Sequence, residues 1–366
     1  MSENKVYIIL ENGKVFEGKP FGAKHQTVGE LVFTTAMTGY LETLTDPSYY
    51  GQVVTQTFPL IGNYGVIPVD FESRKPFLTA YVVREWCQDP SNFRCEGVLD
   101  TFLTENNIPG VYDVDTRELT RIVRESGVMN CMITYDLENM EQKLQQIRSY
   151  VITDAVKNTT VEQTELFAAD PDVQDKLTIV LYDFGAKSNI ARELQKRGCD
   201  VYVVPGGTSA QQALSYKPDG IMLSNGPGDP SENTEIIEEL KNLAKSGVPI
   251  FGICLGHQLL ALSRGGKTAK LKYGHRGGNQ PVKCSDDNKV YITSQNHGYA
   301  VVSESMGSNA VVNYVNVNDG TCEGVRYSDF PGYTVQFHPE ACCGPKDTEF
   351  LFDKFIDFVK EKRVNN

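Results

Sequence analysis

The chain has 366 residues, which is enough for two or three domains with buried cores. Acidic residues outnumber basic ones by 47 to 35, the formal net charge is −12, and no block of lysine and arginine could track phosphates, so nucleic acid is not expected as a partner. The start, "MSENKVYIIL", has too short an apolar run for a signal peptide, and no stretch approaches the ~20 apolar residues of a membrane span, so a membrane association is not expected.

The first part of the chain, residues 1–150, is predicted to be a mixed β and α domain. "VYIILENGKVFEG" contains two β-rich runs on either side of an Asn-Gly pair, which favours a tight hairpin turn, and "FLTAYVVREW" is another strand candidate. "DTRELTRIVRESG" is predicted to be a helix with Asp115 as its N-cap, Glu118 as the capping-box partner and Gly127 as the stop.

The composition then turns polar. "DLENMEQKLQQIRSY" is predicted to be helical, and "AADPDVQDK" has the composition of a linker. We therefore expect a linker over 151–176, which separates the first domain from a second domain over 177–366.

From Leu177 onward, strand and helix patterns alternate. "LTIVLYDF" is a continuous apolar run, as expected for a strand that is covered on both faces. Further strands in "DVYVVP", "DGIMLSNGPG" and "VPIFGI" alternate with helices in "AKSNIARELQKRG", "SENTEIIEELKNLAKSG" and "LGHQLLALSRGG". This alternation predicts an α/β fold with a doubly wound, mostly parallel sheet, in which functional loops lie at the carboxyl ends of the strands.

The last ninety residues are predicted to be richer in β-structure. "GHRGGNQPVKC", "KVYITSQNHGYAV" and "GTCEGVRY" are interpreted as further β-rich connections. "GYTVQFHPE" is predicted to be a strand, and "DTEFLFDKFIDFVKEK" has apolar residues at helical spacing and is predicted to close the fold as a helix.

Nine cysteines are scattered along the chain, an odd number without a dense framework. No C-x-x-C or H-E-x-x-H spacing indicates a metal site, so no metal is expected. Reduced thiols in a cytoplasmic protein are the natural inference from this pattern.

One cysteine lies where a predicted strand runs into a predicted helix. "GICLG" places Cys254 between two glycines, which is the G-x-nucleophile-x-G form of a sharp turn that exposes a nucleophile at the edge of a sheet. The positive end of the following helix favours the thiolate, and the backbone amide of Leu255 would point to where an acyl oxyanion forms. A buried structural cysteine explains the stretch about equally well, because free cysteine is among the most buried residue types.

A cysteine nucleophile needs a base, and the chain has five histidines. His338 ends a predicted strand in "QFHPE", and because residues i and i+2 of an extended segment project to the same side, Glu340 can reach its imidazole. A carboxylate on one ring nitrogen fixes the tautomer and leaves the other nitrogen to take the thiol proton. His257 is expected to pack within a helix, and the other three histidines are expected in loops with structural roles. Without Cys254, an unrelated His and Glu at a strand end would be the favoured interpretation.

The loop in "LSNGPGDP" follows a predicted parallel strand. Glycines at positions 226 and 228 let backbone amides approach a substrate that side chains would obstruct. An ordinary turn accounts for an isolated G-P-G equally well, and the position after the strand is what favours a functional interpretation.

A phosphate-binding loop is not expected. "RGGKT" resembles the end of one, but Ala261 stands where the first glycine of G-x-x-x-x-G-K-T is needed, and the stretch follows a helix. No G-x-G-x-x-G occurs either. The chain itself is therefore not expected to bind ATP or a dinucleotide.

Three motifs in order, "SNGPGDP", "GICLGHQ" and "HPE", resemble those of the class I, triad-type glutamine amidotransferase domain, over about 177–363. In the first domain "VGELVFTTAMTGYLETLTDPSYYGQVV", "IGNYG" and "DVDTREL" are similar to the small, glutaminase subunit of carbamoyl phosphate synthetase. "YDFGAKSNI", "QNHGYAV" and "GPKDTEFLFDKF" extend that resemblance over nearly the whole chain.

The resemblance implies an activity and a set of site residues. Cys254 would attack the side-chain amide of L-glutamine to give a γ-glutamyl thioester, His338 would carry the proton to the leaving ammonia, and Glu340 would orient His338. The backbone amides of Leu255 and Gly226 would stabilise the oxyanion. The residues implied to hold glutamine are Ser48, Gly226, Gly228, Leu255, Gln258, Asn296, Gly298 and Tyr299.

The resemblance also implies a partner. The family's large subunit uses ATP and bicarbonate, so ATP and a divalent metal are expected there, with no cofactor in this chain. Ammonia should pass to that subunit of the heterodimer by a protected route, because free ammonia is mostly protonated at neutral pH and is then not nucleophilic. The product would be carbamoyl phosphate for arginine and pyrimidine synthesis.

Some positions depart from the family's usual pattern. Cys342 and Cys343 stand where Ser-Pro commonly follows the HPEA stretch, which changes the loop after the triad and its sensitivity to oxidation. Thr34 and Leu41 replace the usual Asn and Gln, which affects the expected contact with the large subunit.

Two alternatives remain at this stage. One is a glutaminase of another synthase, for anthranilate or GMP synthesis, although such glutaminases do not carry this N-terminal domain. The other is a non-catalytic binding or scaffold protein that keeps the same fold.

Overall fold

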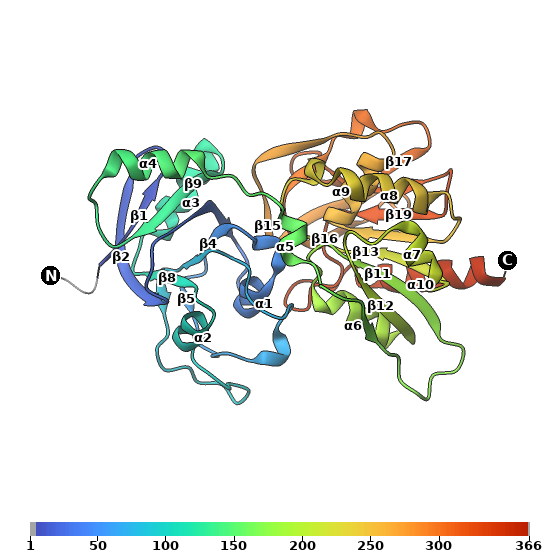
Figure 1. Cartoon of the computed structure of the whole chain (residues 1–366), viewed down its shortest axis with the longest axis horizontal. Helices are drawn as coiled ribbons and strands as arrows, with labels where there is room; N and C mark the ends of the chain where they lie inside the picture. The colour runs from blue at the N-terminus through green and yellow to red at the C-terminus, as the bar shows by residue number, and fades with distance from the viewer. Residues whose placement is uncertain (1–4, 365–366) are drawn as a thin grey trace. The chain divides into compact units, whose positions relative to one another are not determined.

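The computed structural model describes residues 5–364. The chain divides into two compact units between Thr153 and Asp154 (Figure 1). In the described part of the chain, no helix is long and apolar enough to cross a membrane.

The first unit is built around a closed β-barrel. Its strands are β1 (Val6–Leu10), β2 (Val15–Gly22), β3 (Thr27–Thr34), β4 (Gln52–Gln56), β5 (Leu60–Ile61), β6 (Ala80–Val82), β7 (Glu85–Trp86), β8 (Pro109–Tyr112) and β9 (Met129–Thr134). Its helices are α1 (Tyr40–Thr45), α2 (Leu99–Glu105), α3 (Thr116–Ser126) and α4 (Met140–Ser149). The barrel order is β1-β2-β8-β6-β4-β3-β9, and β5 pairs with β7 outside it. The parallel pair β3–β4 is joined through α1, as a parallel pair requires a crossover.

The β1–β2 hairpin and the start of helix α3 can be compared with the sequence predictions. The predicted hairpin is confirmed, because β1 and β2 pair antiparallel on either side of the Asn-Gly turn. The predicted helix is α3, and Asp115 caps it by accepting from the Glu118 amide at 2.9 Å. The capping box is wrong: the Glu118 carboxylate instead contacts Lys14 and Arg121, whose charged groups are stronger donors than a backbone amide.

The segment predicted as a linker contains regular structure. It holds helix α5 (Ala155–Thr159) and strand β10 (Glu165–Phe167), and β10 pairs antiparallel with β12 (Cys199–Pro205). The division between the units accordingly lies near the start of this segment. Both elements are short and polar, so periodicity carried little information about them.

The second unit is an α/β unit with one ten-stranded sheet. Its other strands are β11 (Leu177–Asp183), β13 (Gly220–Leu223), β14 (Ile250–Ile253), β15 (Thr268–Cys284), β16 (Val290–Val301), β17 (Ala310–Asn316), β18 (Cys322–Tyr327) and β19 (Gly332–Val335). Its other helices are α6 (Ser188–Lys196), α7 (Ala210–Ser215), α8 (Thr234–Ala244), α9 (Leu255–Ser263) and α10 (Phe350–Val364). The strand order is β10-β12-β11-β13-β14-β19-β18-β17-β15-β16.

Only the middle of this sheet is parallel. Strands β12, β11, β13, β14 and β19 run parallel, whereas β10, β18, β17, β15 and β16 join by antiparallel pairs. The prediction of a mostly parallel sheet therefore overstates the parallel part. The stretches interpreted as β-rich connections are strands of the same sheet, and because no helix separates them they pair antiparallel.

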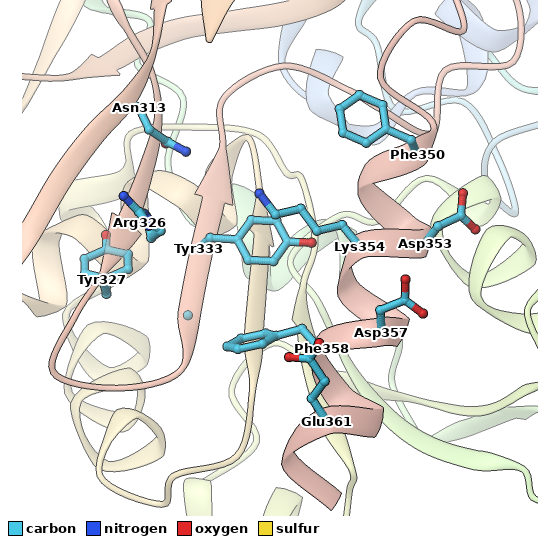
Figure 2. Close-up of a pocket in the computed structure, with 11 residues that line it drawn as sticks. Asn313, Arg326, Tyr327, Tyr333, Phe350, Asp353, Lys354, Asp357, Phe358 and Glu361 are labelled. Carbon is cyan, nitrogen blue, oxygen red and sulfur yellow. The ribbon is translucent and has the colours of Figure 1, made fainter. Parts of the chain in front are cut away.

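A cavity of about 720 Å³ lies between the sheet and α10 (Figure 2). Tyr333 and Phe358 contribute aromatic surface to it, and the Lys354 ammonium lies 5.3 Å from the centre of the Tyr333 ring. Tyr333 is at the amino end of β19. The cavity is therefore near the opposite end of that strand from the loop that carries His338.

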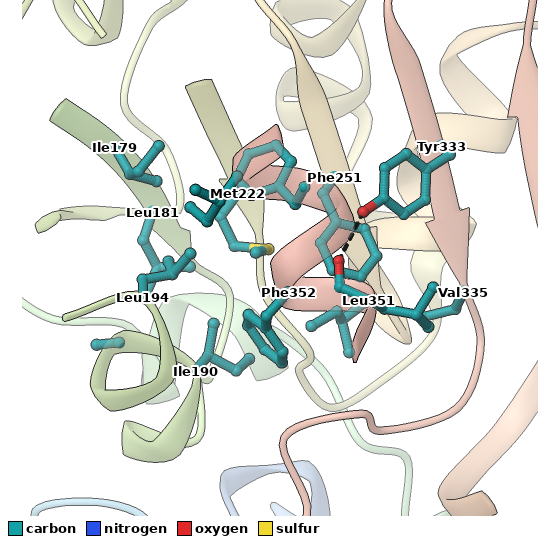
Figure 3. Packing of buried hydrophobic residues seen from close by; sticks show 14 of the residues in the cluster. Ile179, Leu181, Ile190, Leu194, Met222, Phe251, Tyr333, Val335, Leu351 and Phe352 are labelled. Atoms are coloured by element: carbon teal, nitrogen blue, oxygen red, sulfur yellow. Dashed lines mark hydrogen bonds between the residues drawn. The ribbon is translucent and has the colours of Figure 1, made fainter. Parts of the chain in front are cut away.

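Apolar side chains fill both faces of the parallel region. Ile179 and Leu181 of β11 belong to a core with α6 and α10, which Figure 3 shows packed around Phe251. Val180 and Tyr182 of the same strand belong to a second core with α7, α8 and α9. Alternate side chains of a strand point to opposite faces, so helices cover both sides and the predicted doubly wound arrangement is present.

Candidate active site

Cys254 occupies the bend between β14 and α9. Its backbone has φ 52° and ψ −102°, a region that residues with a side chain rarely adopt, and such strain costs about 1–3 kcal/mol. Glycines allow the surrounding close packing: a Cβ at Gly256 would lie 2.5 Å from the Leu223 carbonyl oxygen, and one at Gly252 would lie 2.9 Å from Thr334. The predicted sharp turn is present. The cysteine is 2% exposed, so it lies within the protein and not on an open edge.

His338 and Glu340 follow the strand beside this bend. Strands β14 and β19 are parallel neighbours, and the Cys254 amide donates to the carbonyl of Val335, the last residue of β19, at 2.8 Å. Nδ1 of His338 lies 2.6 Å from Oε1 of Glu340, and both side chains are buried. The predicted contact is present, although it forms in a turn, because β19 has already ended.

The protonation state of His338 depends on its neighbours. Burial and the Lys187 ammonium disfavour the charged ring, but the Glu340 carboxylate and the Cys254 sulfur outweigh them and raise the pKa of His338. Burial alone would raise the pKa of Glu340, yet the His338 ring and Lys187 hold it below its ordinary value. Nε2 of His338 is buried and makes no hydrogen bond of ordinary geometry within residues 5–364.

The structure adds Lys187, which the sequence analysis did not select. Its ammonium lies 3.2 Å from Nδ1 of His338 and 3.3 Å from Oε1 of Glu340. Asn225, in the loop after β13, accepts from the Lys187 amide at 3.0 Å, and Asn189 donates to the Glu340 carbonyl. Lys187 follows β11 within "YDFGAKSNI". Its position after the carboxyl end of a parallel strand, where functional residues of such sheets lie, was the only sequence feature that could have indicated it.

Two backbone amides predicted to face an oxyanion belong to segments in close contact. Leu255 is the first residue of α9, and Gly226 lies in the loop after β13. A Cβ at Gly226 would lie 2.2 Å from the Phe184 carbonyl oxygen and 2.8 Å from the Leu255 side chain. Only glycine fits there. Gly228 in the same loop has φ 89°, which also favours glycine.

Some of the residues predicted to hold glutamine lie in segments next to Cys254. The Cys254 sulfur is 3.8 Å from the Asn296 carbonyl oxygen, and Asn296, Gly298 and Tyr299 are consecutive or nearly so on β16. The Gln258 amide donates to the Tyr299 carbonyl at 2.7 Å and to Gln336 at 2.9 Å. Both protons of the Gln258 side-chain amide are therefore used in hydrogen bonds within the protein, and one of these bonds supports the β16 backbone.

Ser48 belongs to the first unit. It lies in the short 3-10 helix η1 (Pro47–Tyr49), where its amide donates to Asp46 at 2.9 Å. Its side chain is largely buried.

The bend, the doubly wound sheet and the Cys/His/Glu group define the second unit as a class I glutamine amidotransferase domain. The family model described as "Glutamine amidotransferase class-I" matches residues 180–358. The model described as "Carbamoyl-phosphate synthase small chain, CPSase domain" matches residues 8–133.

Similar proteins extend the likeness over the whole chain. The carbamoyl phosphate synthase small chain of Clostridium perfringens is 49% identical over 97% of this chain and 99% of its own length. The small chain of Fusobacterium nucleatum is 50% identical over 95% of this chain and 96% of its own. The small chain of Oceanobacillus iheyensis is 49% identical over 98% of this chain and 96% of its own. The chain belongs to the carbamoyl phosphate synthase small chain family.

Proposed function

We propose that this chain is the glutamine-hydrolysing subunit of carbamoyl phosphate synthase and that Cys254 is its nucleophile. The observation that carries the proposal is a sulfur on a strained bend beside a buried imidazole, whose other nitrogen contacts a carboxylate at 2.6 Å. A cysteine, a histidine and an orienting acid form the constellation that acyl transfer requires.

The first half of the reaction releases ammonia. The Cys254 proton moves to Nε2 of His338, and the sulfur attacks the side-chain amide carbon of glutamine. The negative charge that develops on the amide oxygen is stabilised by the backbone amides of Leu255 and Gly226. His338 then returns its proton to the amide nitrogen, the carbon–nitrogen bond breaks, and ammonia leaves behind a γ-glutamyl thioester.

The second half regenerates the thiol. A water molecule gives a proton to His338 while its oxygen attacks the thioester carbon. The carbon–sulfur bond breaks, the sulfur recovers the proton from His338, and glutamate leaves. Glu340 keeps Nδ1 of the ring protonated and oriented through both halves, so Nε2 stays the acting nitrogen.

Lys187 is a positioning residue in this scheme. Its ammonium contacts both His338 and Glu340, so it restrains the carboxylate and limits how strongly the ring holds its proton. Buried charges of this kind are stable only when they are paired, which makes the three side chains a coupled group.

Substrate contacts are assigned from the family resemblance and from position. Gly228, Asn296, Gly298 and Tyr299 would bind the amino-acid end of glutamine, and Gln258 would hold the Tyr299 backbone for this purpose. The family resemblance alone also assigns Ser48 to glutamine binding.

The ammonia would be used by a large subunit, which would combine it with bicarbonate and ATP to make carbamoyl phosphate for arginine and pyrimidine synthesis in the cytoplasm. ATP and a divalent metal would bind to that partner. The family membership supports this assignment over a glutaminase of anthranilate or GMP synthesis.

The proposal is tested by replacing the nucleophile. We expect Cys254→Ser to lose glutamine hydrolysis almost completely, and an electrophilic glutamine analogue to label the wild type at Cys254 but not the variant. Hydrolysis by the variant at the wild-type rate would refute the assigned nucleophile.

A second experiment tests the partner. Mixing the purified chain with carbamoyl phosphate synthase large subunits should give glutamine-dependent carbamoyl phosphate formation. Activity with an anthranilate or GMP synthase instead would contradict the assignment. Failure of the analogue to label any cysteine would favour a non-catalytic scaffold.

A further inference from the structure

Three buried side chains that the proposed reaction does not use meet in the antiparallel part of the second unit's sheet. They are His275 of β15, His297 of β16 and Glu323 of β18, and one ligand atom from each lies within 4.8 Å of the others. His275 and His297 are direct partners in the β15–β16 ladder. Glu323 lies at an irregularity in the β17–β18 register, where a bulge can redirect a side chain.

Each imidazole already gives one nitrogen to another group. Nε2 of His275 lies 2.8 Å from Asp319, and Nδ1 of His297 lies 2.8 Å from the Tyr299 carbonyl oxygen. Both acceptors require a proton on the nitrogen they contact, which leaves the other nitrogen of a neutral ring with a lone pair. A metal-binding histidine almost always donates its other ring N–H to a carboxylate, a backbone carbonyl or water.

The surroundings of His297 leave two acceptors facing each other. The Thr293 hydroxyl donates to the Gln280 carbonyl at 2.9 Å and therefore accepts from the amide nitrogen of Gln295 at 3.1 Å. This orients the Gln295 side-chain oxygen toward Nε2 of His297, at 3.1 Å. With Nδ1 donating to the Tyr299 carbonyl, Nε2 of the neutral ring has only a lone pair to offer. A cation would satisfy both atoms.

Glu323 presents the same need. Its side chain is fully buried, and Asn316 donates to one carboxylate oxygen at 3.1 Å. The same oxygen lies 3.5 Å from Nδ1 of His275, which forms an ion pair with it when the ring is protonated. The other carboxylate oxygen makes no hydrogen bond within residues 5–364. A buried polar atom without a partner is unfavourable, and more so when it is charged.

We propose that His275, His297 and Glu323 bind one divalent transition metal ion, with Zn²⁺ the best match to two imidazoles and a carboxylate. Three protein ligands leave a fourth position, which the Gln295 oxygen or water would fill. Asp319 is the outer residue of the group, with a side chain 44% exposed. The proposed ligands come from three strands that are far apart in sequence, so no short ligand-spacing motif could indicate them.

The ion would fix the backbone that is proposed to bind glutamine, because His297 lies between Asn296 and Gly298. That consequence depends on the proposed function, whereas metal binding itself does not. The two are therefore tested separately, first by binding and then by activity.

Binding is measured on the full chain after treatment with a chelator. We expect one equivalent of Zn²⁺ to bind in competition with a chromophoric indicator, and Co²⁺ to give ligand-field bands without a thiolate charge-transfer band. The second criterion separates this site from binding by the nine cysteines. Zn²⁺ should also raise the midpoint of thermal unfolding.

Matched variants test the ligands. Glu323→Gln keeps the side-chain shape but removes the charge, and should weaken Zn²⁺ binding at least tenfold. Asp319→Asn changes a partly exposed residue whose Oδ2 contacts the outer nitrogen of His275 and whose Oδ1 accepts from the Thr321 amide, and it should weaken Zn²⁺ binding about 10- to 100-fold. Asp286→Asn is the control: its carboxylate contacts Asn313 and Arg326, away from the cluster, so binding should not change.

Three results would overturn the proposal. These are the absence of a one-equivalent complex, a Co²⁺ spectrum with thiolate bands, and equal affinity in the wild type, Glu323→Gln and Asp319→Asn. The cluster would then be a buried ion pair within a hydrogen-bond network. If Zn²⁺ binds as expected but does not change the KM for glutamine, the site stands and only its link to glutamine binding fails.

Discussion

The backbone is closely packed beneath the nucleophile, where the start of α9 meets β13. A Cβ added at Gly256 would lie 2.5 Å from the Leu223 carbonyl oxygen and 2.6 Å from the Leu223 Cβ. Because protein interiors are close-packed and backbone cannot rotate away, relief of that overlap requires the helix start to move by about 0.5–1 Å. The movement would carry Cys254 and the Leu255 amide with it. We expect Gly256→Ala to lose about 1–3 kcal/mol of stability through overpacking.

The same shift should reduce catalysis, since a misplacement of about 1 Å can cost about 10²-fold. We therefore expect kcat/KM for glutamine hydrolysis to fall about 10- to 100-fold in Gly256→Ala, with a lower midpoint of thermal unfolding. Gly207→Ala is the matched control, because a Cβ there meets nothing within 4 Å. It should leave both quantities unchanged. If Gly256→Ala unfolds earlier but hydrolyses glutamine at the wild-type rate, the packing does not position the nucleophile and the reasoning is wrong.

Three further predictions concern charged and buried groups. Lys187→Met removes a cation that lowers the pKa of His338, so the acid limb of the kcat/KM profile should move to higher pH; an unmoved limb would exclude this role. Burial lowers the pKa of His257 to about 3, so below about pH 6.5 this histidine takes up a proton in the unfolded chain but not in the folded protein. Its contribution to stability should therefore fall by about 1.4 kcal/mol for each unit by which the pH is lowered. In urea unfolding, His257→Gln should make the loss of stability between pH 7 and pH 5 smaller by that contribution, and an equal loss in both proteins would contradict this. Asp183→Ala leaves three backbone amides without their acceptor and should cost about 3 kcal/mol or more in the same assay, against a smaller loss in Asp183→Asn.

The parts of the candidate site that sequence could indicate are local ones. The sharp turn at Cys254 follows from two glycines that only a tight strand-to-helix bend requires. The contact between His338 and Glu340 joins residues two positions apart, and needs no knowledge of the strand order. The catalytic roles of these residues stay predictions.

Lys187 shows what local patterns miss. It lies 151 positions before His338, and the two meet because β11 and β19 are brought to the same region of the sheet through β13 and β14. Strand order depends on how whole surfaces pack, and the alternation of helix and strand does not encode it. The cluster of His275, His297 and Glu323 was missed for the same reason.

The antiparallel half of the sheet escaped prediction for a different reason. Strands β15 and β16 carry glycine, asparagine and histidine at many positions, which is typical of loops. Their pairing is stabilised by the ladder and by side-chain hydrogen bonds such as those of Thr293, and propensity has little weight in comparison.

The backbone angles at Cys254 are unfavourable for a residue with a side chain, so this residue lowers the stability of the fold. A glycine at position 254 would adopt the same backbone angles without strain, so replacing Cys254 with glycine would increase stability and remove the sulfur. A side chain at this position is therefore unfavourable for folding, and the proposed nucleophile requires one. Stability and the proposed chemistry thus have opposite requirements at residue 254.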